Sequence, residues 1–291
     1  MNRVFAWVLV LLAISSVPVS AQEQTDVIVV ESDRDKVPST TQIVRALSKE
    51  VDGSIPRFQK PVCPGVAGLR LPLATAIVAR MRENIEEAGQ ALAAEGCTPN
   101  LTLIFTDDGQ QLIQELISKS PRIFGLLTAH EIGKLKSAPG PGWAWHATVA
   151  KRADGGPVAD PTGIPPGPKP KGSYSVPNAS LSRLSSPVRR DIEAAFVVIT
   201  VDAISGLTVR QLADYATLRG LSVSPNLIAR EILDDSILSL FDDRTNDRDP
   251  VDQLTSFDRA YLSGVYSGNA GLTYRQKTKL IAQAIERSER D

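Results

Sequence analysis

The sequence predicts an α+β domain, that is, a mixed α/β fold in which a twisted mixed sheet is packed against helices. Two observations lead to this prediction. Short apolar runs typical of buried strands are interspersed with longer segments whose apolar residues recur every three or four positions, as in amphipathic helices. In addition, 42% of the 291 residues are apolar, which is enough for a sizeable core.

Up to residue 106, the chain contains two predicted strands, two predicted helices and an extended segment. A Val-Ile-Val-Val run indicates a short strand, and apolar residues spaced four apart indicate a helix after it. A proline-punctuated extended segment then precedes a long amphipathic helix and a buried strand. In order, these elements are expected at residues 26–31, 41–51, 57–69, 73–94 and 100–106.

Asp107 and Asp108 follow the buried strand and precede a further amphipathic helix. A carboxylate in this place usually caps the helix by accepting backbone N–H groups. The alternative is a metal or acid–base site built on the pair. The sequence favours the cap.

The second half contains a predicted hairpin of two antiparallel strands, a central strand and three capped helices. Residues 143–151 alternate as a strand does, residues 152–174 form a loop rich in proline and glycine, and residues 173–184 are expected to return as a strand. Residues 192–201 are almost wholly apolar, which predicts a central strand. Capping-box patterns then predict helix starts at Thr208, Thr255 and Thr273.

Residues 1–21 resemble a secretory signal peptide. Arg3 precedes an apolar run at residues 4–14 that is too short to span a bilayer, and small residues precede the expected cleavage site. We therefore expect a periplasmic or secreted protein with no integral membrane segment after cleavage. The mature chain divides into an extension at 22–54 and a main domain at 55–291.

Charge and cysteine content narrow the class of protein further. The chain has 32 Lys+Arg against 33 Asp+Glu, and this balance argues against nucleic acid or an anionic membrane as partner. Cys63 and Cys97 are the only cysteines. In an oxidising compartment such a pair is expected to form a disulfide, the alternative being two buried thiols.

Two motifs near the carboxyl end carry a family resemblance. Ser236-Ile237-Leu238-Ser239 is followed by Leu254-Thr255-Ser256-Phe257-Asp258, and the next helix ends near Tyr266. Together with the order of the elements, these motifs resemble the catalytic domain of the metzincin zinc proteases, in which a Ser-Ile-Met-Ser turn lies beneath the metal. The chain is also similar to a group of uncharacterised secreted proteobacterial proteins that share the sequence Leu212-Ala213-Asp214-Tyr215. The resemblance implies a zincin-like architecture over the main domain.

The zinc-binding residues of that family are replaced here. Its helix carries His-Glu-x-x-His and a third histidine, so that imidazoles bind zinc and the glutamate acts as general base. The aligned ligand positions fall at Arg210, Asp214 and Gly220, and the base falls at Gln211. These side chains do not suit zinc, so no metal or other cofactor is expected. Arg210 and Asp214 could instead form a buried ion pair in the space of the metal, or an ordinary solvated helix pair.

The resemblance leads to two expectations about function. The first is a non-catalytic protein that uses the former substrate cleft, or the proline-rich loop, to bind a peptide or protein partner. The alternative is a hydrolase in which His130 or His146 acts with Asp107, Asp108 or Asp214. The acidic segment 242–249 is expected to be a solvated loop, and calcium binding by its carboxylates is the less favoured alternative. A purely structural role in the cell envelope is also compatible with the sequence.

Overall fold

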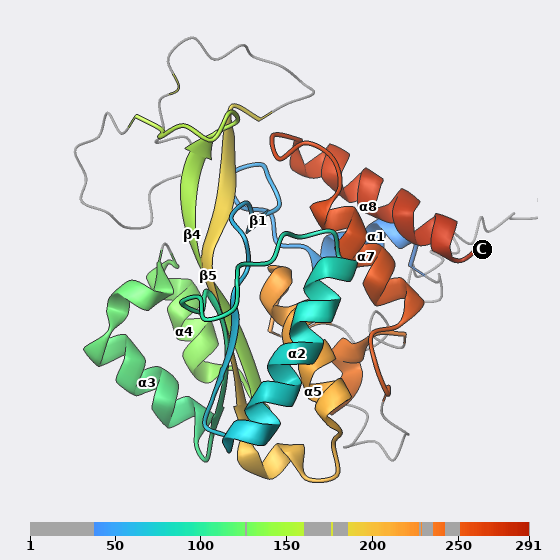
Figure 1. Ribbon diagram of the computed structural model, residues 1–291. Coiled ribbons are helices and arrows are strands. Elements are labelled where there is room, and N and C mark those ends of the chain that lie inside the picture. Colours follow the sequence, from blue (N-terminus) through green and yellow to red (C-terminus); the bar gives the residue numbers. More distant parts are fainter. Residues whose placement is uncertain are drawn as a thin grey trace, which may run out of the picture. The chain divides into compact units, whose positions relative to one another are not determined.

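The computed structural model describes residues 38–125, 127–159, 176, 186–226, 228, 235–241 and 251–290 (Figure 1). These residues belong to the compact unit Pro38–Asp291. Several predicted features lie outside them: the signal peptide, the strand at 26–31, most of the loop at 152–174 and the segment at 242–249. The described part has a mixed α/β fold, as the sequence predicts.

The described helices and strands agree with much of the predicted order, and the hairpin differs from it. Their bounds are α1 (Thr40–Leu47), β1 (Arg57–Phe58), β2 (Pro64–Ala67), α2 (Leu71–Glu87), β3 (Leu101–Thr106), α3 (Gly109–Lys119), η2 (Pro121–Phe124), α4 (Ala129–Ser137), β4 (Gly142–Arg152), β5 (Val188–Thr200), η3 (Val201–Ile204), α5 (Val209–Leu221), η5 (Ile237–Ser239), α7 (Ser256–Tyr266) and α8 (Tyr274–Ser288). None of the described helices is long and apolar enough to cross a membrane.

Strand β5 is the centre of the sheet. It pairs in parallel with β1 and β3, β3 pairs in parallel with β2, and β4 pairs antiparallel with β5. The central strand predicted at 192–201 is therefore confirmed. The hairpin is corrected, because β5 itself is the antiparallel partner of β4, and Val176 is in no strand. The other residues of the return strand expected at 173–184 lie outside the described part.

Helices cover both faces of the sheet (Figure 1). Helices α2 and α5 lie on one face, while α3, η2 and α4 lie on the other. Alternation along β4 assigns Trp143 and Trp145 to the cluster with α3 and α4, and Ala144 to the larger cluster with α2 and α5. His146 thus shares the face that α5 covers. Helices α1, α7 and α8 pack together and add to the larger cluster.

Helix α2 ends at Glu87, whereas the sequence predicts a helix to residue 94. Gly89 adopts φ +79°, and the N–H of Gln90 donates to the carbonyl of Ile85 at 3.1 Å, which closes the helix in a Schellman motif. The following residues pair with the extended segment instead: Val62 N–H donates to Ala91 O at 2.8 Å, and Ala93 N–H donates to Val62 O at 2.9 Å. The apolar spacing continues past the helix because Leu92 still packs against the core.

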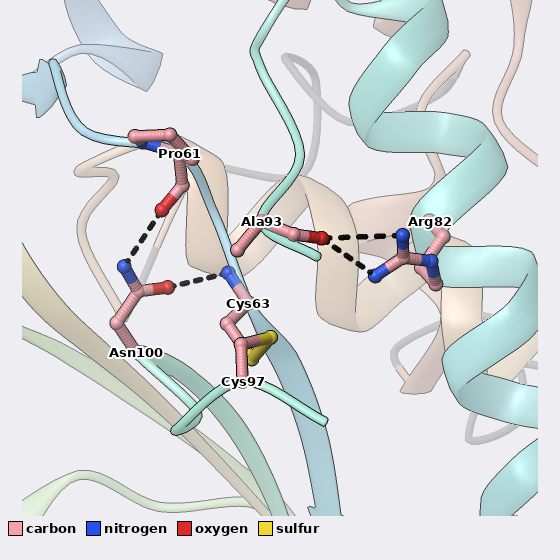
Figure 2. Close-up of a disulfide and its surroundings, with 6 residues drawn as sticks. All are labelled: Pro61, Cys63, Arg82, Ala93, Cys97 and Asn100. Atoms are coloured by element: carbon pink, nitrogen blue, oxygen red, sulfur yellow. Dashed lines mark hydrogen bonds between the residues drawn. A yellow bond between two sulfur atoms is a disulfide. The ribbon is translucent and has the colours of Figure 1, made fainter. Parts of the chain in front are cut away.

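The disulfide expected between Cys63 and Cys97 is present (Figure 2). Figure 2 shows Asn100 beside it, accepting a hydrogen bond from Cys63 N at 2.8 Å and donating one to Pro61 O at 3.1 Å. Arg82 of α2 donates to Ala93 O at 3.2 Å through both terminal nitrogens. Closing a loop of this length stabilises the fold by about 3–4 kcal/mol in chain-entropy models.

The predicted helix caps are also present. Thr208, Thr255 and Thr273 each form a capping box with the residue three positions later. Asp108 caps α3, since its carboxylate accepts the N–H of Gln111 at 2.8 Å, and Asp107 is exposed beside it. Of the Asp107–Asp108 pair, Asp108 therefore acts as the expected helix cap.

Candidate functional site

Helix α5 is enclosed by its neighbours. Every residue from Gln211 to Leu221 is buried, so the helix has no solvated face beyond its first turn. Each polar side chain on it must find a partner inside the protein, because a buried polar group without one costs free energy. Asp214 and Arg219 are its two buried charged residues.

Asp214 is fully buried and has a complete set of partners. Arg80 of α2 donates to both of its carboxylate oxygens, from Nε at 2.8 Å and from Nη2 at 3.2 Å. Asn84 Nδ2 donates at 2.7 Å, and the backbone N–H of Leu254 donates at 2.7 Å. The carboxylate therefore joins α2, α5 and the segment before α7. This is a bidentate, charge-assisted arrangement of the kind that holds a framework together.

The ion pair suggested between Arg210 and Asp214 is wrong. Arg210 is exposed, and the hydrogen bond described for it is to Gln253 Oε1 at 3.5 Å. Asp214 is directed to α2 instead, where Arg80 presents two nitrogens to it. The difference arises because α2 covers Asp214 but leaves the first turn of α5 in solvent.

Gln211 and Gly220, the other two residues expected at degenerate zinc-site positions on α5, have separate contacts. Gln211 Oε1 accepts from Thr208 N at 2.9 Å, and its Nε2 donates to Val251 O at 3.1 Å. At Gly220 a Cβ would come within 2.8 Å of the Leu101 side chain, so α5 packs closely on β3 there. In the described part of the chain, no group of three or more His, Cys, Asp or Glu side chains is arranged to hold a metal.

The two motifs near the carboxyl end form one hydrogen-bonded unit. Asp258 accepts from Ser236 Oγ at 2.6 Å, from Ile237 N at 2.8 Å and from Thr255 N at 3.1 Å. The aspartate that completes the capping box of α7 therefore also holds η5 in place. Burial raises the pKa of Asp258, and these hydrogen bonds oppose the rise. Leu238, in the middle of η5, stays partly exposed.

The two histidines lie in different settings, and neither is described as bonded to a carboxylate. His146 of β4 is buried, and its Nε2 lies 3.0 Å from Gly220 O, to which the neutral ring donates. Burial lowers the pKa of His146 to about 4. His130 is exposed on α4. Asp108 and Asp214, proposed as their partners, are engaged elsewhere.

A cavity of about 90 Å³ lies between the start of β4, the second half of α5 and η5. Leu238, the third residue of the Ser236–Ser239 turn, forms part of its wall. Tyr215 and Phe241 meet edge to face beside it, with ring centroids 5.0 Å apart. The lining residues are Pro139, Gly140, Pro141, Gly142, Tyr215, Arg219, Asn226, Ile228, Leu238 and Phe241.

Arg219 is the charged residue of this cavity, and its partners are neutral. It is 3% exposed, and Nη1 donates to Ser224 Oγ at 3.0 Å and to Pro225 O at 2.8 Å. Nη2 donates to Asn226 Oδ1, which also accepts the N–H of Ala144 on β4 at 3.0 Å. Nε has no hydrogen-bond partner. Arg219 lies in the last turn of α5, where the helix dipole is worth only about 0.3–1 kcal/mol, against several kcal/mol for burying a charge.

Sequence reasoning did not identify Arg219, Asn226 or Phe241 as site residues. The one available signal was an arginine within the otherwise apolar second half of α5. The convergence of β4, α5 and η5 depends on long-range packing, which the local pattern does not encode. No protein-family model, no curated protein and no solved structure matches this chain.

Proposed function

We propose that this is a non-catalytic, metzincin-like protein of the periplasm or the extracellular space that binds a peptide or protein partner. The main supporting observation is the state of Asp214. It occupies the aligned position of the second zinc ligand, and its carboxylate is saturated by Arg80, Asn84 and Leu254 N. A zinc ion at that carboxylate would have to displace a bidentate arginine. The chemistry of the site therefore supports a retained scaffold with a structural ion pair in place of metal ligation.

The unit formed by η5 and α7 gives further support. Asp258 explains in physical terms why the Ser236–Ser239 turn and the Leu254–Asp258 segment occur together, because one carboxylate holds both. Tyr266, at the end of α7, donates to Leu221 O at the end of α5 at 2.9 Å. The residues that carry the family resemblance thus form a framework around α5.

The cavity beside Leu238 is a concave surface that a partner could occupy. Its walls combine apolar side chains with a few polar groups, as is usual for small binding sites. The proline-rich loop at 152–174 is the other surface proposed, and most of it lies outside the described part. The disulfide and the lack of a membrane-spanning helix among the described residues fit a secreted protein.

Metal analysis of the purified protein tests the loss of zinc chemistry. We expect less than about 0.1 zinc per chain, and a melting temperature that a chelator leaves unchanged, because ligation contributes to the stability of a zinc protein. Stoichiometric zinc, or a melting temperature lowered by the chelator, would contradict the proposal.

Binding is tested with an array of short peptides. We expect saturable binding that survives chelation, and loss of binding in Leu238→Arg, which places a long charged side chain at the cavity. The matched control is Leu71→Arg, since Leu71 is 78% exposed at the start of α2. Binding that Leu71→Arg and Leu238→Arg reduce equally would exclude the cavity as the binding surface.

The hydrolase remains the alternative, but no described contact favours it. His146 is enclosed between β4 and α5, and His130 is exposed and bonded to none of the proposed partners. Peptide hydrolysis that is abolished by His130→Gln or His146→Gln would replace the binding proposal with this alternative.

A further inference from the structure

We propose that the cavity between β4, α5 and η5 is a binding site for a carboxylate group, with Arg219 as its charged partner. The proposal deepens the function proposed above by naming the ligand chemistry, and it rests on that function only where the carboxylate belongs to a peptide. It is independent of the resemblance to metzincins.

The first argument is the charge of Arg219. The guanidinium is 97% enclosed, yet each of its described hydrogen bonds goes to a neutral oxygen, and it takes part in none of the ion pairs of the described residues. No Asp or Glu is among the described residues that line the cavity. An arginine side chain cannot relieve this situation by losing its proton. Among the described residues, the site therefore contains no anion.

The second argument is the number and geometry of the donors that remain. A guanidinium has five N–H donors, and Arg219 uses two on Nη1 and one on Nη2. The remaining donors are Nε–H and one N–H of Nη2. Nε and Nη2 form one edge of a guanidinium, and the two nitrogens of such an edge match the two oxygens of a carboxylate.

The same edge binds carboxylates elsewhere in this protein. Arg80 donates to Asp214 from Nε at 2.8 Å and from Nη2 at 3.2 Å. Arg189 donates to Asp191 from Nε at 2.9 Å and from Nη2 at 3.1 Å. In Arg219 the corresponding Nε is without a partner. Solvent does not reach this atom in the protein without ligand. Binding through this edge therefore requires the guanidinium to turn toward the cavity, and we expect that rotation when a carboxylate enters.

The third argument is the shape and polarity of the cavity. About 90 Å³ is several times the roughly 10–15 Å³ that one water molecule requires, so a carboxylate with a short apolar group fits. Ile228, Leu238 and Phe241 supply apolar walls next to the single charge. A phosphate would bring more oxygens than the two remaining donors satisfy. The site therefore suits a carboxylate attached to an apolar group, from a small acid or from the end of a peptide.

Titration with isobutyrate, and with the neutral isostere isobutyramide, tests the charge requirement in the unmodified protein. Calorimetry and the ¹⁵N–¹H resonance of the Arg219 Nε group are the readouts. We expect saturable binding of isobutyrate, a shift of that resonance, and at least tenfold weaker binding of isobutyramide. Equal binding of both compounds, or no binding of either, would overturn the proposal.

Substitution then assigns the charge to Arg219. Arg219→Gln should weaken isobutyrate binding at least tenfold, while Arg210→Gln, an exposed arginine on the same helix, should leave it within twofold. If Arg219→Gln does not fold, Leu238→Trp replaces it, because the larger ring fills the cavity and should also abolish binding. Unchanged affinity in the folded variant would refute the site.

A peptide carrying a carboxyl-terminal valine, in its free and amidated forms, separates this inference from the proposed function. Preference for the free acid that Arg219→Gln removes supports both. Binding of isobutyrate without binding of either peptide supports the carboxylate site and contradicts the peptide function. Peptide binding that ignores amidation and Arg219→Gln supports the peptide function and contradicts the site.

Discussion

Asp214 and Arg219 are buried charges on the same helix, α5, and their surroundings differ. The carboxylate of Asp214 receives four hydrogen bonds, two of them from an arginine. The guanidinium of Arg219 has only neutral acceptors and one nitrogen without a partner. A buried charge with a complete set of partners holds elements together, whereas a buried charge with no opposite charge among the described residues is where we propose that a ligand binds.

The largest loss of stability is expected from Asp214→Ala. The substitution removes the fully buried partner of Arg80 and takes a hydrogen-bond acceptor from Arg80, Asn84 and the N–H of Leu254, which should lower the free energy of unfolding by about 3–5 kcal/mol. Urea denaturation measures the change. The matched control is Glu83→Gln, because Glu83 binds the same Arg80 from an exposed position and should cost less than about 1 kcal/mol. Equal losses in the two variants would show that Asp214 is not the framework charge.

A somewhat smaller loss of stability is expected when His146 becomes protonated at low pH. Its folded-state pKa of about 4 lies below the ordinary 6.5, so the unfolded chain takes up the proton first as the pH falls. The stabilisation by the neutral ring is complete above about pH 6.5 and is lost as the pH falls toward 4, a change on the order of 3 kcal/mol.

Unfolding free energies at pH 7 and pH 4.5 test the role of His146. His146→Gln, which keeps a donor for Gly220 O, should lose less stability on acidification than the original protein. His130→Gln, at an exposed position, should behave like the original. Identical acid sensitivity in all three proteins would mean that His146 is not the titrating group.

Lys277 sharpens the contrast with Arg219, because it is a buried cation that can lose its proton. Its amine donates to Ser267 O, and burial, with a smaller contribution from nearby Arg57, lowers its pKa to about 7. The unfolded chain holds this proton up to about pH 10.5, so stability should rise as the pH increases from 7 toward 10. Melting temperatures at pH 7 and 9 should show this rise. Lys277→Met should reduce it, and Lys279→Met, at an exposed position, should not.

The smallest effect on stability is expected from Arg219→Met without ligand. The cost of burying an unpaired guanidinium offsets the hydrogen bonds to Ser224, Pro225 and Asn226, so the free energy of unfolding should change by less than about 1 kcal/mol. Urea denaturation of this variant beside Asp214→Ala gives a direct comparison. A loss as large as that of Asp214→Ala would make Arg219 a framework residue and remove the contrast.

Local signals predicted much of the fold. The central strand, the disulfide and the caps at Thr208, Thr255 and Thr273 follow from apolar runs, cysteine number and residue spacing. The end of α2 could not be predicted in this way, because Val62 competes for the backbone of the segment that follows. The partner of Asp214 was missed for a related reason, since Arg80 lies 134 residues away in sequence.

The sequence by itself determined the class of fold, the paired cysteines and the absence of the zinc-ligand pattern, because these depend on residue types and short-range periodicity. Only the tertiary structure decided that Asp214 binds Arg80 rather than Arg210, that Asp258 joins η5 to α7, and that Arg219 borders a cavity whose described lining holds no opposite charge. These outcomes depend on which side chains α2, β4 and η5 bring to the buried helix. Burial makes the free-energy differences between such arrangements large, because a charge removed from water must be paired within the packed interior.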